Sequence, residues 1–410
     1  MQMENVEKAI QHLREGKLVL VADDEDREAE GDLIGIAEYA TPETVNRMIT
    51  SARGLLCAPI SADIAQKLKL DRMTQHNSDP FGTNFTISID HSETTTGISA
   101  TERAKTICAL ADDATSEQDF LRPGHIFPLV AKQGGVLERR GHTEAAVDLA
   151  RLAGAAPAAY ICEVLKKDGT MARRKDLKAL AEGLQIPMIT VEDIVRYRYI
   201  NDPYVLQREI KVQLPSRYGR FEVEAINTVK DDQTQLFISK GDMENKQNPL
   251  LLRLHSECLT GDVFGSSRCD CGDQLHMALR KIEENGHGAV LYLRQEGRGI
   301  GLVNKLHAYA LQEKKVDTFE ANIQLGFQPD ERDYGIAAAM LHAKGIKQVR
   351  LMTNNPDKME KLAYYGIEVV ERIPLEMAAK EENIHYLQTK KEKFHHYLHV
   401  EGYNNESIIR

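Results

Sequence analysis

Apolar and polar positions alternate along the first half of the chain in ways that predict short helices and strands. Apolar residues at helical spacing across 6–13 predict an opening helix, which Gly16 would end. Further helices are expected at 145–152 and 177–184. Continuous apolar runs predict buried strands at 18–22, 54–60 and 158–164. Helices and strands that follow one another in this way are typical of mixed α/β architecture.

The second half begins differently, because residues over 210–214 and 221–226 alternate as in an antiparallel pair of strands. Buried strands are expected after them at 250–255, 289–293 and 349–352. Between the halves, Asn201-Asp202-Pro203 favours a linker, since proline breaks a helix. We therefore expect an α+β or mixed α/β fold with two domains, 1–200 and 201–410.

Composition agrees with a two-domain globular protein and excludes some classes of function. At 410 residues the chain is too long for one ordinary core, and its net charge of −10 argues against nonspecific nucleic-acid binding. No apolar run approaches the roughly 18 residues that span a bilayer, and the N-terminus lacks the features of a secretory signal. Cys57, Cys108 and Cys162 are isolated among apolar neighbours, as reduced buried thiols are. We expect a cytoplasmic protein without membrane or nucleic-acid partners, whose polar tail 381–410 is part helix and part frayed end.

Three of the six cysteines, Cys258, Cys269 and Cys271, crowd into one turn-rich segment. Three thiolates suit a soft divalent metal, and zinc is the commonest choice. A structural zinc site uses four protein ligands, whereas a catalytic site keeps one position open. A trio of cysteines without a fourth nearby therefore indicates an open, catalytic zinc site.

A strongly acidic stretch follows the first predicted strand, with seven carboxylates among the ten residues 23–32. Charge runs are often solvated turns, and that alternative stays open on this stretch alone. Carboxylates repel one another unless a cation offsets them, and Mg²⁺ prefers oxygen ligands. The position at a strand end also favours a functional loop.

A second polar cluster, Glu138 to Glu144, opens the predicted helix at 145–152. A histidine at a helix start is more often a surface or capping residue. Here His142 is flanked by arginines, a glycine and a threonine, which can hold an anion at a helix N-terminus.

Four motifs in order make the first 200 residues resemble 3,4-dihydroxy-2-butanone-4-phosphate synthase: 24–33, 95–99, 122–128 and 141–144. The resemblance implies conversion of ribulose 5-phosphate to 3,4-dihydroxy-2-butanone 4-phosphate and formate, with Mg²⁺ or Mn²⁺ held by Glu28 and His142. It implies Asp32 and Glu163 as acid/base groups. The implied substrate contacts are Arg27, Glu28, Asp32, Arg139, Arg140, Gly141, His142, Thr143 and Glu163. Ala29 and Arg140 depart from the residues usual in that family, asparagine and alanine.

A glycine-rich turn at 295–302 can cradle an anion at a helix start, although a tight α/β connection looks similar. It lacks the lysine-hydroxyl pair of a Walker A loop and the glycine spacing of a dinucleotide fingerprint. Further polar groups stand at strand ends near 328–335 and 353–358, where ligand sites of α/β domains lie.

Together with the cysteines, these motifs make residues 250–374 resemble GTP cyclohydrolase II. The resemblance implies that GTP gives a diaminopyrimidine ribosyl phosphate, formate and pyrophosphate, with zinc on Cys258, Cys269 and Cys271, while Mg²⁺ could accompany GTP. It implies Asp330 as proton acceptor, Arg332 as nucleophile on the α-phosphate, and Tyr309 near the base. A guanidinium is a poor nucleophile, so charge stabilisation is the simpler role for Arg332. The implied GTP contacts are Arg253, Leu254, His255, Ser256, Glu257, Gln274, Glu296, Gly297, Arg298, Thr318, Thr353 and Lys358.

The leading hypothesis is therefore one chain with two catalytic domains, which supply the two branches of riboflavin synthesis. The resemblance also implies that the protein is a homodimer. One alternative is a structural zinc ribbon in a nucleic-acid-binding module, against which the acidic balance and the missing fourth cysteine count. Another is that one half is inactive and serves as a dimerisation scaffold.

Overall fold

The computed structural model describes residues 2–24, 27–244, 248–314 and 316–399, and within them the chain forms two compact units. The first contains the residues up to Arg198 together with Val229–Asp231, and the second contains Tyr199–Thr228 and the chain from Asp232 onward. The boundary between the two units thus falls inside helix α7 (Val191–Asn201). It lies close to residue 200, after which we expected the second catalytic domain to begin, and that functional boundary stays a prediction. At the expected linker, Asp202 caps the short 3₁₀ helix η4 (Pro203–Val205).

The first unit is built on a mixed seven-stranded sheet with the order β4-β5-β3-β6-β2-β1-β7. Its strands are β1 (Val19–Ala22), β2 (Gly31–Ile36), β3 (Cys57–Ile60), β4 (Ile89–His91), β5 (Phe120–Val130), β6 (Ala159–Glu163) and β7 (Met188–Thr190). Its helices are α1 (Gln2–Arg14), α2 (Pro42–Ala52), α3 (Ala62–Lys67), α4 (Ala100–Ala111), α5 (His142–Leu152), α6 (Arg174–Leu184) and α7, with short 3₁₀ turns at Ala37–Tyr39, Glu117–Asp119 and Gly135–Leu137.

Burial explains why these segments form the sheet. Every residue of β1, β2 and β3 is buried, as expected where helices cover both faces of a sheet. The antiparallel register of β2 and β6 pairs Asp32 with Glu163, at the end of β2 that lies beside the loop after β1. The sheet therefore brings the acidic stretch and the end of β6 to one place.

The second unit also has a mixed seven-stranded sheet, with the order β14-β13-β11-β12-β10-β9-β8. Its strands are β8 (Leu206–Ser216), β9 (Gly219–Thr228), β10 (Gln235–Lys240), β11 (Leu250–Ser256), β12 (Gly288–Leu293), β13 (Gln348–Met352) and β14 (Glu368–Ile373). Its helices are α8 (Leu259–Asp262), α9 (Cys271–Asn285), α10 (Gly301–Gln312), α11 (Thr318–Gln324), α12 (Gly335–Ala343), α13 (Pro356–Tyr364) and α14 (Ile384–Lys393), with the 3₁₀ turn η5 (Glu296–Gly299). The expected α/β fold class with two domains is confirmed.

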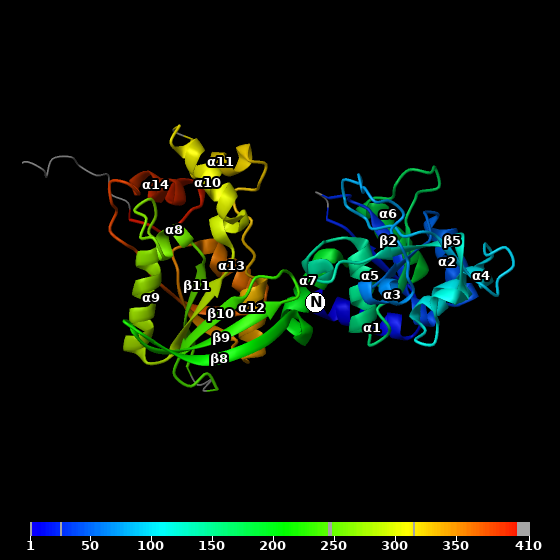
Figure 1. Ribbon diagram of the computed structural model, residues 1–410, viewed down its shortest axis with the longest axis horizontal. Coiled ribbons are helices and arrows are strands. Elements are labelled where there is room, and N and C mark those ends of the chain that lie inside the picture. The colour runs from blue at the N-terminus through cyan, green and yellow to red at the C-terminus, as the bar shows by residue number, and fades with distance from the viewer. Residues whose placement is uncertain (1, 25–26, 245–247, 315, 400–410) are drawn as a thin grey trace, which may run out of the picture. The chain divides into compact units, whose positions relative to one another are not determined.

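Strand direction in this sheet determines where polar side chains gather. β8, β9 and β10 are antiparallel, as the alternating residues predicted, whereas β11, β12, β13 and β14 run parallel. Parallel strands end at one edge, where ligand sites of α/β sheets form. Figure 1 shows α8, α10, α11 and α14 gathered at one end of this unit. No helix in the described part of the chain is long and apolar enough to cross a membrane.

Two candidate active sites

Three potential metal ligands from two segments meet in the first unit. Asp23 and Glu28 both lie in the loop between β1 and β2, and His142 is the first residue of α5. One ligand atom of each lies within 4.8 Å of the others. Two carboxylates and an imidazole suit Mg²⁺ or Mn²⁺. The acidic stretch left a cation site and a solvated turn open, and the resemblance implied Glu28 and His142 as ligands but not Asp23.

Asp32 lies next to this cluster in a buried, electronegative position. Burial, followed by the charges of Glu163 and Glu28, raises the pKa of Asp32 well above its ordinary value. Its Oδ1 lies 3.7 Å from Nδ1 of His142, and neither this oxygen nor Nε2 of His142 has a hydrogen-bond partner among the described residues. Buried polar atoms left without partners mark a place for a ligand. Glu163 is anchored by the backbone N–H of Leu55, which donates to its Oε2 at 2.8 Å.

The loop that carries Glu28 is held from both sides by arginines. Arg27 lies 2.5 Å from the carboxylate of Asp23 and 2.9 Å from that of Glu28. Arg173 donates to the backbone carbonyls of Glu28 and Ala29 at 2.7 and 2.9 Å. These contacts keep Ala29 in the left-handed region, with a φ of 53°. Glu25 and Asp26 of the acidic stretch lie outside the described residues.

The start of α5 explains the residues around His142. Gly141 caps the helix, and a Cβ there would lie 2.3 Å from the guanidinium of Arg139. Arg139 pairs with buried Glu144 at 2.5 Å and is therefore fixed beside the helix start. Thr143 is buried next to His142. Arg140 pairs with Glu192 at 2.5 Å and also lies 3.9 Å from the carboxylate of Asp24, the residue after the potential metal ligand Asp23.

The three cysteines of the second unit come together where β11 ends and α9 begins. Cys258 follows β11, Cys271 opens α9, and the Sγ atoms of Cys258 and Cys269 are 3.6 Å apart. Ligands about 2.3 Å from a tetrahedral zinc lie roughly 3.8 Å from one another, so the spacing fits zinc. Gly261 packs against the trio, because a Cβ there would lie 2.8 Å from Sγ of Cys269.

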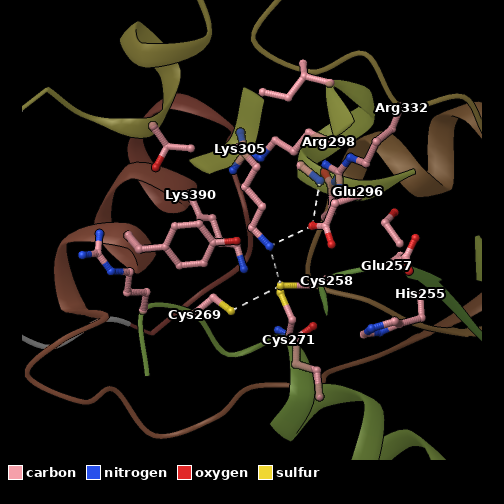
Figure 2. A pocket seen from close by; sticks show the side chains of 18 of the residues that line it. His255, Glu257, Cys258, Cys269, Cys271, Glu296, Arg298, Lys305, Arg332 and Lys390 are labelled. Carbon is pink, nitrogen blue, oxygen red and sulfur yellow. Dashed lines mark hydrogen bonds and ion pairs between the residues drawn. The ribbon is translucent and has the colours of Figure 1, made fainter. Parts of the chain in front are cut away.

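A cavity opens beside these thiols. Most of the expected GTP-binding and catalytic residues line it: Arg253, His255, Ser256, Glu257, Gln274, Glu296, Gly297, Arg298, Tyr309, Thr318, Arg332, Thr353 and Lys358. Figure 2 shows several of them around the cysteines. Leu254 contributes through its backbone, since its carbonyl accepts from Lys358 at 2.8 Å. Asp330 is not among the lining residues, but its carboxylate accepts a hydrogen bond from Nε of Arg332 at 2.8 Å.

The cavity wall carries an excess of buried cations. Burial, followed by the charges of Arg253 and Arg332, lowers the pKa of Lys358 well below its ordinary value. Nη1 of Arg298 is buried without a hydrogen-bond partner among the described residues. Cations crowded so closely repel one another, and an anionic ligand would relieve that repulsion. The wall therefore suits a polyphosphate.

A buried polar network positions the first cysteine. Asp262 accepts hydrogen bonds from the backbone N–H of Cys258 and the hydroxyl of Tyr292, at 3.0 and 2.9 Å. The same carboxylate lies 3.0 Å from Nε2 of His255, whose ring stacks on that of Tyr292. Burial lowers the pKa of His255. Asp262 thus links the end of β11 to the turn that carries the thiol.

Several residues of this wall were not found from the sequence. Lys305 lines the cavity from α10, and Tyr386, Lys390 and His396 line it from the C-terminal segment. The segment was expected only to be part helix and part frayed end; its described part forms α14 and the residues up to His399, while 400–410 lie outside the described residues. A polar tail carries no pattern that indicates a ligand site, so tertiary contact alone reveals it.

Comparison with known proteins identifies a family for each half of the chain. The family model of 3,4-dihydroxy-2-butanone 4-phosphate synthase matches residues 7–197, and that of GTP cyclohydrolase II matches residues 207–374. Riboflavin biosynthesis protein RibBA of Bacillus cereus (strain B4264) is 55% identical over 395 residues, which cover 96% of this chain and 99% of that protein. The RibBA of Bacillus subtilis (strain 168) is 53% identical over 394 residues.

A solved structure supports the architecture as well. RibBX, a two domain 3,4-dihydroxy-2-butanone 4-phosphate synthase from A. baumannii, has a TM-score of 0.66 and 32% identity, and the match covers 91% of this chain and 99% of that one. The chain is thus a bifunctional enzyme that joins a 3,4-dihydroxy-2-butanone 4-phosphate synthase to a GTP cyclohydrolase II. It belongs to the RibBA family of riboflavin biosynthesis proteins. An inactive scaffold half is not favoured.

Proposed function

We propose that the first unit converts ribulose 5-phosphate to 3,4-dihydroxy-2-butanone 4-phosphate and formate at the cluster of Asp23, Glu28 and His142. The observation that carries this assignment is the convergence of these three ligands beside Asp32, a carboxyl group whose pKa is raised. A divalent Mg²⁺ or Mn²⁺ held there would polarise the substrate carbonyl and stabilise an enediol. Burial lowers the pKa of His142, which favours the neutral imidazole that binds metals.

Carboxyl groups of the protein are proposed to accept and donate the protons in this reaction. A general base is most effective when its pKa lies near the working pH, and burial moves the pKa of Asp32 in that direction. The register of β2 and β6 places Glu163 directly opposite, so a second carboxylate can take or return a proton. Arg139 and Thr143, fixed at the start of α5, are proposed to hold the substrate phosphate.

We propose that the second unit opens the guanine ring of GTP and releases formate and pyrophosphate. The single supporting observation is the thiol trio at one end of a cavity whose wall is rich in buried cations. Zinc on the three cysteines would supply a Lewis acid that activates water. Arg253, Arg298 and Lys358 are proposed to bind the triphosphate, with Mg²⁺ as a further partner of the nucleotide.

Asp330 and Arg332 act as a pair in this proposal. Burial alone would raise the pKa of Asp330, but the neighbouring guanidinium outweighs it and lowers that pKa. Asp330 can therefore accept a proton only after Arg332 has left the Asp330 carboxylate and paired with the α-phosphate of GTP. A paired guanidinium stays charged, so Arg332 stabilises charge rather than attacking phosphorus. A phosphoramidate trapped on Arg332 would contradict this role.

Tyr309 is proposed to assist at the base end of the cavity. Its hydroxyl lies 3.3 Å from Oγ1 of Thr260, which itself lies 3.7 Å from Sγ of Cys258. The guanidinium of Arg268 lies 4.9 Å from the centre of its ring. These contacts hold the phenol beside the thiols, where it can orient a nucleobase.

The proposal includes a cytoplasmic homodimer. All six cysteines are free, as thiols are in a reducing compartment. Formate release measured separately with ribulose 5-phosphate and with GTP tests the two activities, and metal analysis of the purified protein tests the two centres. Failure of formate release with either substrate in the fully metallated protein would overturn the corresponding half.

A further inference from the structure

Lys305 places its ammonium directly on one of the three thiols. From α10 its Nζ lies 3.2 Å from Sγ of Cys258 and 2.9 Å from Oγ1 of Thr260. The same Nζ lies 2.8 Å from Oε1 of Glu296. Figure 2 shows the lysine extending between Glu296 and Cys258.

These three acceptors use the whole hydrogen-bonding capacity of the ammonium, since a lysine has three donors. The side chain is also buried, with 8% of the residue exposed. A lysine in this state has no free donor for a phosphate or a base. Its position therefore does not suit substrate binding, although it lines the cavity.

Both carboxylate oxygens of Glu296 likewise accept hydrogen bonds from other groups of the protein. Its Oε2 accepts from the backbone N–H of Leu259 at 2.6 Å, and its Oε1 accepts from that of Gly297 at 3.0 Å as well as from Lys305. The carboxylate thus joins the glycine-rich turn, the start of α8 and Lys305. Because α8 begins directly after Cys258, movement of Lys305 or Glu296 is transmitted to the thiol.

We propose that Lys305 is a positioning residue that tunes the metal centre by withdrawing negative charge from the Cys258 thiolate. The inference rests on the proposed zinc site and deepens it. Three thiolates donate strongly to a metal and weaken it as a Lewis acid, and a charged hydrogen bond to one sulfur opposes that donation. Glu296 moderates the effect, because it shares the ammonium.

Cobalt(II) in place of zinc tests this inference through the sulfur-to-cobalt absorption band of the full-length protein. In Lys305→Gln the thiolate donates more strongly, so the band is expected to move to longer wavelength. In Glu296→Gln the sulfur receives more of the ammonium's charge, and the band is expected to move to shorter wavelength. Lys344→Gln is the matched control, since Lys344 is a partly buried lysine of the same unit that pairs with Glu224 and does not line the cavity.

Kinetics give a second readout. With zinc restored, Lys305→Gln should lower kcat for formate release from GTP on the order of 10- to 100-fold, as loss of a group behind a metal ligand does, while KM changes little. Lys305→Arg keeps the charge and should recover part of kcat. A rise in KM at unchanged kcat would make Lys305 a substrate-binding residue and overturn the inference.

The outcomes separate this inference from the proposed function. Wild-type protein that binds neither zinc nor cobalt would overturn the metal centre, and this inference with it. A cobalt-loaded Lys305→Gln protein with an unmoved band overturns the inference alone. If Lys305→Gln does not fold, Glu296→Gln decides, and a band that stays in place or moves to longer wavelength overturns the role of Lys305.

Discussion

The ammonium of Lys390 lies 2.8 Å from the carboxylate of Asp270, the residue between Cys269 and Cys271. Both side chains are buried. Gln274 continues the chain of contacts, since it lies 2.5 Å from Asp270 on one side and 2.5 Å from Arg253 on the other. The C-terminal helix α14, which lies beyond the matched residues 207–374, therefore supports the thiol loop and a proposed GTP contact at once.

Replacing Lys390 with methionine should impair the GTP reaction selectively. Asp270 would remain buried without its cation, and removing one partner of a buried pair costs about 3–5 kcal/mol. We expect α14 to detach from the cavity and formate release from GTP to fall, while the ribulose 5-phosphate reaction is unchanged. Lys393→Met is the control, because Lys393 makes a solvent-exposed pair with Asp317 worth about 1 kcal/mol or less. Equal activity of the two variants would contradict the role of Lys390.

Replacing Cys269 with serine should stop formate release from GTP and lower the zinc content of the protein. Serine has no thiolate, and two cysteines alone hold zinc poorly. The ribulose 5-phosphate reaction should persist. Cys108→Ser serves as control, since this thiol donates to the carbonyl of Ala40 and has no part in either site. Loss of both reactions in Cys269→Ser would show that the halves do not work independently.

Replacing Glu28 with alanine should abolish formate release from ribulose 5-phosphate without unfolding the protein. Removal of a metal ligand should cost more than about 100-fold, the upper range for a residue that only orients a ligand. Circular dichroism and formate release from GTP should both match the wild type. Glu43→Ala, an exposed change in the first turn of α2, should leave both reactions intact. Retained activity in Glu28→Ala would remove Glu28 from the metal site.

The C-terminal segment that carries α14 and His396 should pack less stably on the cavity at acidic pH, because His396 resists protonation only while it is buried there. Burial, followed by the positive charges of Lys390, Arg332, Arg298 and Lys358, lowers the pKa of His396 from 6.5 to about 2. A detached segment takes up a proton below pH 6.5, whereas the docked one does not. Docking therefore loses stability as pH falls from 6.5 towards 2, by at most about 1.4 kcal/mol per pH unit.

Hydrogen exchange of the backbone amides in α14 can measure this loss at pH 7 and at pH 5. In His396→Gln no proton is taken up on detachment, so the difference between the two pH values should shrink. An unchanged difference in that variant would assign the acid sensitivity to other groups.

The backbone at Ala29 makes a separate prediction for stability. A left-handed residue other than glycine costs roughly 1–2 kcal/mol, and asparagine tolerates this conformation better than alanine. Ala29→Asn should therefore raise the free energy of unfolding of the first unit by up to about 1 kcal/mol, and the β-branched Ala29→Val should lower it. Thermal unfolding of both variants would check the order, and a destabilised Ala29→Asn would argue against the φ of 53°.

Local patterns in the sequence determined the classes of element and the chemistry of the ligands. Apolar runs predicted β1, β3 and β6 because a strand covered on both faces must be apolar throughout. Three cysteines in one turn-rich segment predicted a thiolate metal site, and an acidic stretch after a strand indicated either a solvated turn or a site for a hard cation. In each case the groups that act together stand close together in the chain, so their spacing carries the information.

The family resemblance implied several distant partners, among them His142 and Glu163, but only the tertiary structure shows how such residues meet and which others join them. Strand pairing sets Asp32 opposite Glu163, and packing of α5 brings His142 to Asp23. Folding of α10 and α14 over the second cavity places Lys305 on Cys258 and Lys390 on Asp270. A lysine in an ordinary helical pattern shows no sign of a buried partner, because its burial depends on segments far away in the chain. Ligand chemistry is local in sequence, whereas desolvation and charge pairing arise only when the chain folds.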